Sequence, residues 1–135
     1  RYADYLHIAD YYTPNQQEAA KITGKEKPED ALDALRPYFV HPIVKLGGDG
    51  CLVDTDAGVV RVPTMKLDGP AVDATGAGAF IAGLMYGLYH HRPLVECVAL
   101  GNVMGGVCVQ HVGCMTGRIS SEKLEKRAQE ILRRM

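Results

Sequence analysis

The sequence lacks several features that would place it in a class at once. No stretch of about 18 residues is apolar without polar interruption, so a membrane-spanning helix is not expected. The formal net charge is only −1, which argues against nucleic acid or a membrane surface as the main partner. The sequence shows no basic leader followed by an apolar core, the pattern that would indicate a signal peptide. We therefore expect a cytoplasmic protein.

Cysteine pairs at metal-binding spacing are also missing. The four cysteines are Cys51, Cys97, Cys108 and Cys114, and no two of them have Cys-x-x-Cys spacing. Cys97 and Cys108 fall inside an expected helix. We expect reduced thiols rather than a zinc site.

The length and the composition are those of one globular domain. A chain of 135 residues, 47% of them hydrophobic, is long enough to bury a core. We find no internal repeat, low-complexity segment or internal boundary, and we expect one unit over residues 1–135. The chain begins at Arg1 rather than Met. That start is consistent with a fragment, a processed chain or a partly determined one.

Glycine and proline divide the chain into helices and strands. The expected elements are a short helix or strand over 2–9, a break over 10–15, helices over 16–23 and from Pro28, strands over 42–46, 51–55 and 59–63, a buried helix from near Gly76 to His90, a helix over 94–112 and a last helix capped by Ser120 or Ser121. Two adjacent hairpin signals predict an antiparallel patch. The fold class expected is α/β, a sheet flanked by helices.

The most informative stretch is Val72–Gly83, which reads VDATGAGAFIAG. A polar, glycine-rich turn opens there directly into an apolar helix. The first N–H groups of a helix are unpaired and carry partial positive charge, and small residues let an anion approach them. The pattern predicts a phosphate or oxyanion cradle. It is not a Walker-type loop, because no Gly-Lys-Ser/Thr follows. Tight packing of the turn against a sheet is the alternative.

This stretch closely resembles the second signature of the ribokinase (pfkB) family of carbohydrate kinases. The family pattern is Asp-Thr-x-Gly-Ala-Gly-Asp-x-Phe, and the sequence has Asp-Ala-Thr-Gly-Ala-Gly-Ala-Phe. The resemblance covers nearly the whole chain but only the C-terminal half of a family member. It implies a ribokinase-like fold whose nucleotide-binding portion is residues 1–135. The N-terminal half, with its lid and most sugar contacts, would be absent.

One residue of the family signature has no counterpart. In the family, the acidic residue after Gly-Ala-Gly is the catalytic base, whereas Gly78 is followed directly by Ala79. Ala79-Phe80 matches the residues that normally come after that acid, so the position is deleted rather than substituted. Asp73 precedes the turn and does not take over the role. Such a deletion at a helix start rotates the rest of the helix by roughly 100° unless the loop absorbs it.

The resemblance assigns the glycine-rich turn two roles. Gly76, Ala77 and Gly78 would form the anion hole. Asp73 and Thr75 would hold a monovalent cation beside it, and Thr75 would also contact the nucleotide. The alternative for Asp73 and Thr75 is an Asx-type turn and a helix cap.

Asn15 and Glu18 match the family's Asn-x-x-Glu motif. An asparagine amide can donate to a phosphate oxygen, while a carboxylate orders the waters of magnesium. Glu18 would therefore act on Mg²⁺ through water. A helix N-terminus also favours Asn as a cap and an acid in its first turn, so a capping role is the alternative.

The remaining assignments concern the nucleotide. The residues implied by the resemblance are Lys45, Gly47 and Gly50 in one strand and turn, and Asn102, Gly105 and Gly106 in a later helix. Asn102 would lie near the adenine, and the two glycines would leave room for it. An ordinary hairpin and ordinary helix packing are the alternatives.

The activity implied is transfer of the γ-phosphoryl group of ATP to a sugar or sugar-like hydroxyl. ATP and Mg²⁺ are the cofactors, with K⁺ as a further candidate. The partners are a small sugar-like substrate and either a second copy in a homodimer or the missing N-terminal half. Loss of a general base lowers the rate by about 10²–10⁴, so an impaired kinase is expected. The alternative is a non-catalytic nucleotide- or partner-binding module on the same half-fold.

Overall fold

The computed structural model describes residues 8–72, 78–112 and 118–135. The chain forms two compact units, Arg1–Arg61 and Val62–Met135. Neither composition nor glycine and proline placement marks this division, which falls within a strand.

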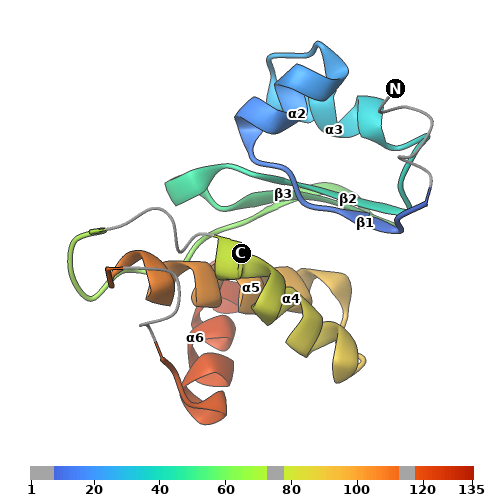
Figure 1. Ribbon diagram of the computed structural model, residues 1–135. Coiled ribbons are helices and arrows are strands. Elements are labelled where there is room, and N and C mark those ends of the chain that lie inside the picture. The colour runs from blue at the N-terminus through green and yellow to red at the C-terminus, as the bar shows by residue number, and fades with distance from the viewer. Residues whose placement is uncertain (1–7, 73–77, 113–117) are drawn as a thin grey trace. The chain divides into compact units, whose positions relative to one another are not determined.

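The first unit is a mixed sheet with two helices on one face (Figure 1). The strands are β1 (Tyr11–Tyr12), β2 (His41–Lys45), β3 (Cys51–Thr55) and β4 (Gly58–Val62), in that spatial order. β1 is parallel to β2, and β2 is antiparallel to β3 with Val44 opposite Leu52. The predicted antiparallel patch is therefore confirmed for β2 and β3. Strand β1 falls where a break was expected, because two residues are too short to show a periodic pattern.

Helices α2 (Gln16–Thr23) and α3 (Pro28–Leu35) follow β1 and have the expected termini. Gly24 ends α2 in the left-handed conformation, with φ 72°. Pro28 opens α3, where its missing N–H is not needed. Between them the two helices carry the chain from β1 to its parallel neighbour β2.

The core of the first unit lies between these helices and the strands. Its buried members are Ala19, Ala31, Leu32, Leu35, Phe39, Val44 and Leu52. Ala31, Leu32 and Leu35 form the buried stripe of α3, and Phe39 lies beyond the end of that helix. Leu32 is fully buried, and truncating such a leucine to alanine costs about 2–5 kcal/mol.

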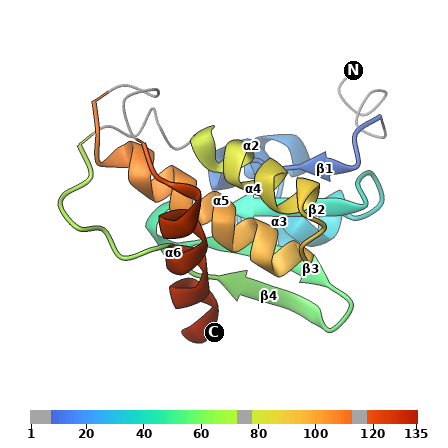
Figure 2. The same ribbon diagram turned by 90° about the horizontal axis from the view of Figure 1, so that it is seen from below.

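The second unit contains three helices, α4 (Phe80–Tyr89), α5 (Leu94–Val109) and α6 (Ser121–Arg133). Figure 2 shows α5 alongside α4, with α6 packed across α5. As its apolar composition predicts, α5 is buried over most of its length, but it ends at Val109 rather than Val112. A 3₁₀ turn at Gly78 and Ala79 precedes α4, and the predicted start near Gly76 lies outside the described residues.

Glycines set the distance between α4 and α5. A Cβ added to Gly83 would lie 2.3 Å from the carbonyl oxygen of Leu100, and one added to Gly87 would lie 2.7 Å from Sγ of Cys97. The ring of Phe80 similarly lies 2.6 Å from the Cβ position of Gly101. Gly101 therefore allows the close approach of Phe80 to α5.

Helix α6 begins as predicted, and Glu125 is one of the residues that link it to the rest of its unit. Ser120 caps it by accepting a hydrogen bond from the Lys123 N–H at 3.2 Å. Oε1 of Glu125 accepts a hydrogen bond from Nη2 of Arg92 at 2.8 Å and another from the hydroxyl of Tyr86 at 3.1 Å. Burial and the Glu125 carboxylate raise the pKa of Tyr86. No helix in the described part of the chain has the length and apolar character to cross a membrane.

Cys51, Cys97 and Cys108 are buried thiols, and none of them is in a disulfide. The reduced state stays a prediction, and Cys114 lies outside the described residues. Burial raises the pKa of Cys51 to about 12, with the positive charge of Lys45 acting in the opposite direction.

Candidate functional site

The carboxyl ends of β1 and β2 bring together the predicted residues of the first unit. The Lys45 N–H donates to the carbonyl of Pro14 at 2.8 Å, and Asn15 forms a parallel bridge with Lys45. This bridge continues the register of β1 and β2 up to the residue that starts α2. In Figure 1 the start of α2 and the turn after β2 lie at the same end of the sheet.

Asn15 and Glu18 form a capping box at the start of α2. Oδ1 of Asn15 accepts from the Glu18 N–H at 2.8 Å, and Oε2 of Glu18 accepts from the Asn15 N–H at 2.9 Å. The capping alternative is thus shown. Both side chains are exposed, and neither Nδ2 of Asn15 nor Oε1 of Glu18 has a hydrogen-bond partner among the described residues. One amide donor and one carboxylate oxygen therefore remain for a ligand.

The turn after β2 requires glycine at two positions. Gly47 has φ 61° and Gly50 has φ 92°, a region that side chains with a Cβ rarely adopt. The Leu46 N–H donates to the Gly50 carbonyl at 2.7 Å and closes the turn, whose residues Gly47–Asp49 form the 3₁₀ helix η1. A Cβ at Gly47 or Gly48 would meet nothing within 4 Å. The backbone of this turn is consequently open to an approaching ligand.

In the second unit, Asn102 holds the chain that leaves β4. Its side chain is only 6% exposed, and Nδ2 donates to the carbonyls of Val62 at 3.1 Å and Pro63 at 2.9 Å. Both N–H groups of that amide are therefore used within the unit. Its predicted place near the adenine stays a prediction.

Met65 fills the space beside Gly106. Its Cγ lies 2.5 Å from where a Cβ of Gly106 would be. This glycine serves helix packing, the alternative given for it, and its place beside the adenine stays a prediction. Gly105, which comes just before it in α5, is half-buried.

The glycine-rich turn is described only from Gly78 onward. Gly78 is exposed, and a Cβ there would meet nothing within 4 Å. Ala79, which comes next at the start of α4, has no side-chain hydrogen bond to the helix and no titratable group. The other predicted residues of the anion hole and the cation site, Asp73, Thr75, Gly76 and Ala77, lie outside the described residues.

Comparison with known proteins decides the family. Residues 1–121 match the profile of the pfkB family of carbohydrate kinases. The chain belongs to this family. The expected ribokinase-like α/β fold is confirmed by its similarity to solved structures of sugar and nucleoside kinases.

Two curated relatives illustrate the sequence similarity. The chain is 34% identical over 106 residues to aminoimidazole riboside kinase of Salmonella typhimurium, covering 73% of this chain and 33% of the relative. It is 31% identical over 107 residues to an uncharacterised sugar kinase of Archaeoglobus fulgidus, covering 78% of this chain and 42% of the relative. The chain thus spans well under half the length of these pfkB proteins.

Two solved structures show the same relation. Aminoimidazole riboside kinase from Salmonella enterica, complexed with the riboside and an ATP analogue, gives a TM-score of 0.80 at 28% identity, over 93% of this chain and 44% of that one. A fructokinase double mutant from Vibrio cholerae O395, with fructose, ADP and potassium bound, gives a TM-score of 0.80 at 26% identity. The match covers 93% of this chain and 42% of the fructokinase.

Proposed function

We propose that this chain is the C-terminal, nucleotide-binding portion of an ATP-dependent pfkB kinase that phosphorylates a hydroxyl of a sugar or a riboside. The observation that carries this proposal is the family match over residues 1–121, together with the signature at Val72–Gly83. The riboside kinase and the fructokinase were solved with an ATP analogue and with ADP, respectively. Potassium in the fructokinase structure supports a monovalent cation at Asp73 and Thr75.

The first unit offers groups for phosphates and for magnesium. The unpartnered Nδ2 of Asn15 would donate to a phosphate oxygen. Magnesium keeps several waters and binds through one or two carboxylates and substrate phosphates. The single exposed carboxylate of Glu18 fits such a site, and the described residues contain no group of three potential protein ligands. The chemistry that the metal supplies when bound is neutralisation of phosphate charge.

The family resemblance alone assigns the remaining nucleotide contacts to residues of the turn after β2 and of helix α5. The open backbone at Gly47 lets a ligand approach closely, and Lys45 adds positive charge at the strand end. Asn102 and Gly105 would face the adenine. In this arrangement Asn102 acts both as an anchor of the β4 exit and as a wall of the base site.

The reacting end of the site would lie at the start of α4. Backbone N–H groups of Gly76, Ala77 and Gly78 would stabilise the developing negative charge. No side chain directly after Gly78 can accept the proton of the acceptor hydroxyl, because Ala79 takes that place. The native chain should therefore transfer phosphate about 10²–10⁴ more slowly than one with the base restored.

Restoring the base tests this proposal. Aspartate is inserted between Gly78 and Ala79, and alanine is inserted at the same point as a control with matched length. ADP formation from ATP is then measured against a panel of hexoses and ribosides. We expect the aspartate insertion to exceed the alanine insertion by about 10²–10⁴ with at least one acceptor. Equal rates for both insertions with every acceptor would show that the missing acid does not limit phosphoryl transfer in this chain.

The missing base also favours a second candidate, a non-catalytic nucleotide-binding module. The observation behind it is again the direct junction of Gly78 and Ala79. In the same assay, ATP binding without transfer in either insertion variant would support the module. Failure of the native protein to bind ATP would eliminate both functions.

A further inference from the structure

A cavity in the second unit gathers positive charge from two separate segments. It has a volume of about 320 Å³, within the range of small-molecule sites. The residues that line it are Met65 and Lys66 from the connector after β4, and Arg127, Glu130, Ile131, Arg133 and Arg134 from α6 and its end. Four of these seven side chains are cationic and one is acidic.

Two of the arginines are held in place. Nη2 of Arg127 contacts both carboxylate oxygens of Asp68, at 2.9 and 2.7 Å, and Nη1 lies 3.7 Å from Glu130. Arg134 donates to the carbonyl of Thr64. Because these side chains are already ordered, a ligand that binds them loses less conformational entropy on association.

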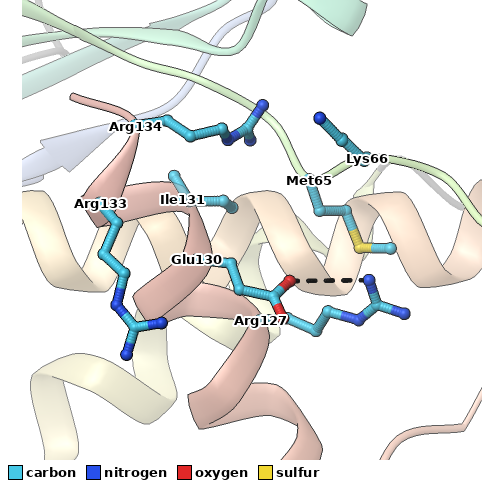
Figure 3. Close-up of a pocket in the computed structure, with 7 residues that line it drawn as sticks. All are labelled: Met65, Lys66, Arg127, Glu130, Ile131, Arg133 and Arg134. Atoms are coloured by element: carbon cyan, nitrogen blue, oxygen red, sulfur yellow. Dashed lines mark ion pairs between the residues drawn. The ribbon is translucent and has the colours of Figure 1, made fainter.

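The charge of the cavity is not neutralised within the unit. Asp68 and Glu130 offset Arg127, whereas Arg134 donates to a neutral carbonyl. Across residues 8–72, 78–112 and 118–135, no ion pair joins Lys66 or Arg134 to a carboxylate. Figure 3 shows the charged ends of Lys66 and Arg134 pointing toward one another. Two like charges directed at one space favour an anion between them.

The dipole of α6 accounts for only part of this pattern. A helix C-terminus carries about half a negative charge, so Arg133 and Arg134 are favourable there in any protein. That explanation does not extend to Lys66, which comes from the connector. In Figure 3 the guanidinium of Arg133 is directed away from Lys66. The helix dipole is therefore sufficient to explain Arg133.

We propose that this cavity binds the phosphate group of a small organic phosphate. Lys66 and Arg134 would contact the phosphate oxygens through charge-assisted hydrogen bonds. The apolar atoms of Met65 and Ile131 would contact the carbon part of the ligand. None of the residues that line this cavity is among those that we assign to the nucleotide.

Calorimetric titration of the full 135-residue chain with ribose 5-phosphate tests the proposal, at constant ionic strength and both without ADP and with saturating ADP. We expect saturable binding that Lys66→Gln and Arg134→Gln each weaken by about tenfold. Arg133→Gln, which removes the same charge from the same helix end, should change the affinity less than twofold. Lys66 makes no hydrogen bond within the described residues, so Lys66→Gln preserves the test if Arg134→Gln fails to fold.

Three results would overturn the proposal: no binding of ribose 5-phosphate, an equal loss in Arg133→Gln, or loss of binding when ADP is present. Inorganic phosphate is titrated in parallel. If it binds as tightly as the ester, the assignment to an organic phosphate is wrong. Binding that persists although ADP itself fails to bind would leave this site standing and refute the proposed nucleotide site.

Discussion

Asn15 and Glu18 each hold the backbone of the other, and each keeps one polar group turned to solvent. The capping box fixes both side chains at the start of α2. The parallel bridge from Asn15 to Lys45 places them beside the end of β2. At the scale of single residues, the cap therefore prepares the positions that we assign to phosphate and magnesium.

Substitutions at Asn15 should separate the cap from ligand binding. Asn15→Ala removes both the capping oxygen and the amide donor, and we expect it to lower the free energy of unfolding by about 1 kcal/mol. Asn15→Ser keeps a capping oxygen but not the donor. Both variants should bind MgATP more weakly, while only the alanine variant loses stability. Urea unfolding and nucleotide titration measure the two effects, and unchanged MgATP affinity in both variants would show that Asn15 only caps.

The Cys51 thiol gives the chain a pH-dependent term in its stability. The pKa of Cys51 is about 12 in the folded chain, against an ordinary value of 9.0, because burial disfavours the thiolate. Its contribution is complete below pH 9 and is lost as the pH rises toward 12. One pH unit above 9.0, the loss is about 1.4 kcal/mol. Cys51→Ala should show a smaller decline in the free energy of unfolding over this interval, and an identical decline would contradict the assignment.

At the scale of elements, the packing of α4 on α5 depends on residues without side chains. Gly83→Ala would place a Cβ 2.3 Å from a backbone carbonyl that cannot rotate away. We expect a loss of about 1–3 kcal/mol in the free energy of unfolding, which outweighs the gain in helix propensity of up to about 1 kcal/mol. Thermal or urea unfolding of the whole chain measures it.

Gly69→Ala is the matched control for this prediction. Gly69 lies in the same unit, is exposed, has no positive φ, and a Cβ there would meet nothing within 4 Å. Its substitution should change the free energy of unfolding by less than about 0.5 kcal/mol. If the two variants were equally stable, the close approach of α4 and α5 would not be a source of stability.

Elements with local signals could be predicted from the sequence, and those that depend on distant pairing could not. The starts of helices α2, α3 and α6 can be predicted because their signals are local: Asn15 and Ser120 cap α2 and α6, and Pro28 opens α3. Strand β1 forms because it pairs with β2, from which two helices separate it in the sequence. Its two residues are too few to show a periodic pattern. The sequence predicts that α5 ends at Val112 rather than Val109, because its apolar composition continues to Val112.

The same distinction applies to the candidate sites. Asn15, Lys45 and Gly50 are recognisable from the order of motifs along the chain, and the structure brings them to one end of the sheet. The cavity between Lys66 and Arg134 joins segments far apart in sequence, and neither segment contains a motif. Only the folded chain shows that their charges converge.

At the scale of the whole molecule, the chain carries the residues that we assign to a nucleotide site but has no acid directly after Gly78. The chain corresponds to 42% and 33% of the length of the two curated relatives described above. Any acceptor pocket that the rest of those proteins forms lies outside the matched residues. Our account therefore separates two properties. Nucleotide binding should belong to these residues, whereas fast phosphoryl transfer should require an acid after Gly78.

The most direct test of this account is calorimetric titration of the purified protein with a non-hydrolysable ATP analogue, with and without magnesium. Glu18→Gln is the matched variant, because glutamine also completes a capping box and preserves α2. We predict saturable binding to one site per chain, weakened about tenfold by Glu18→Gln when magnesium is present and little changed by it when magnesium is absent. The account would be contradicted if the folded protein showed no saturable binding. It would also be contradicted if neither Glu18→Gln nor the removal of magnesium changed the affinity for the analogue.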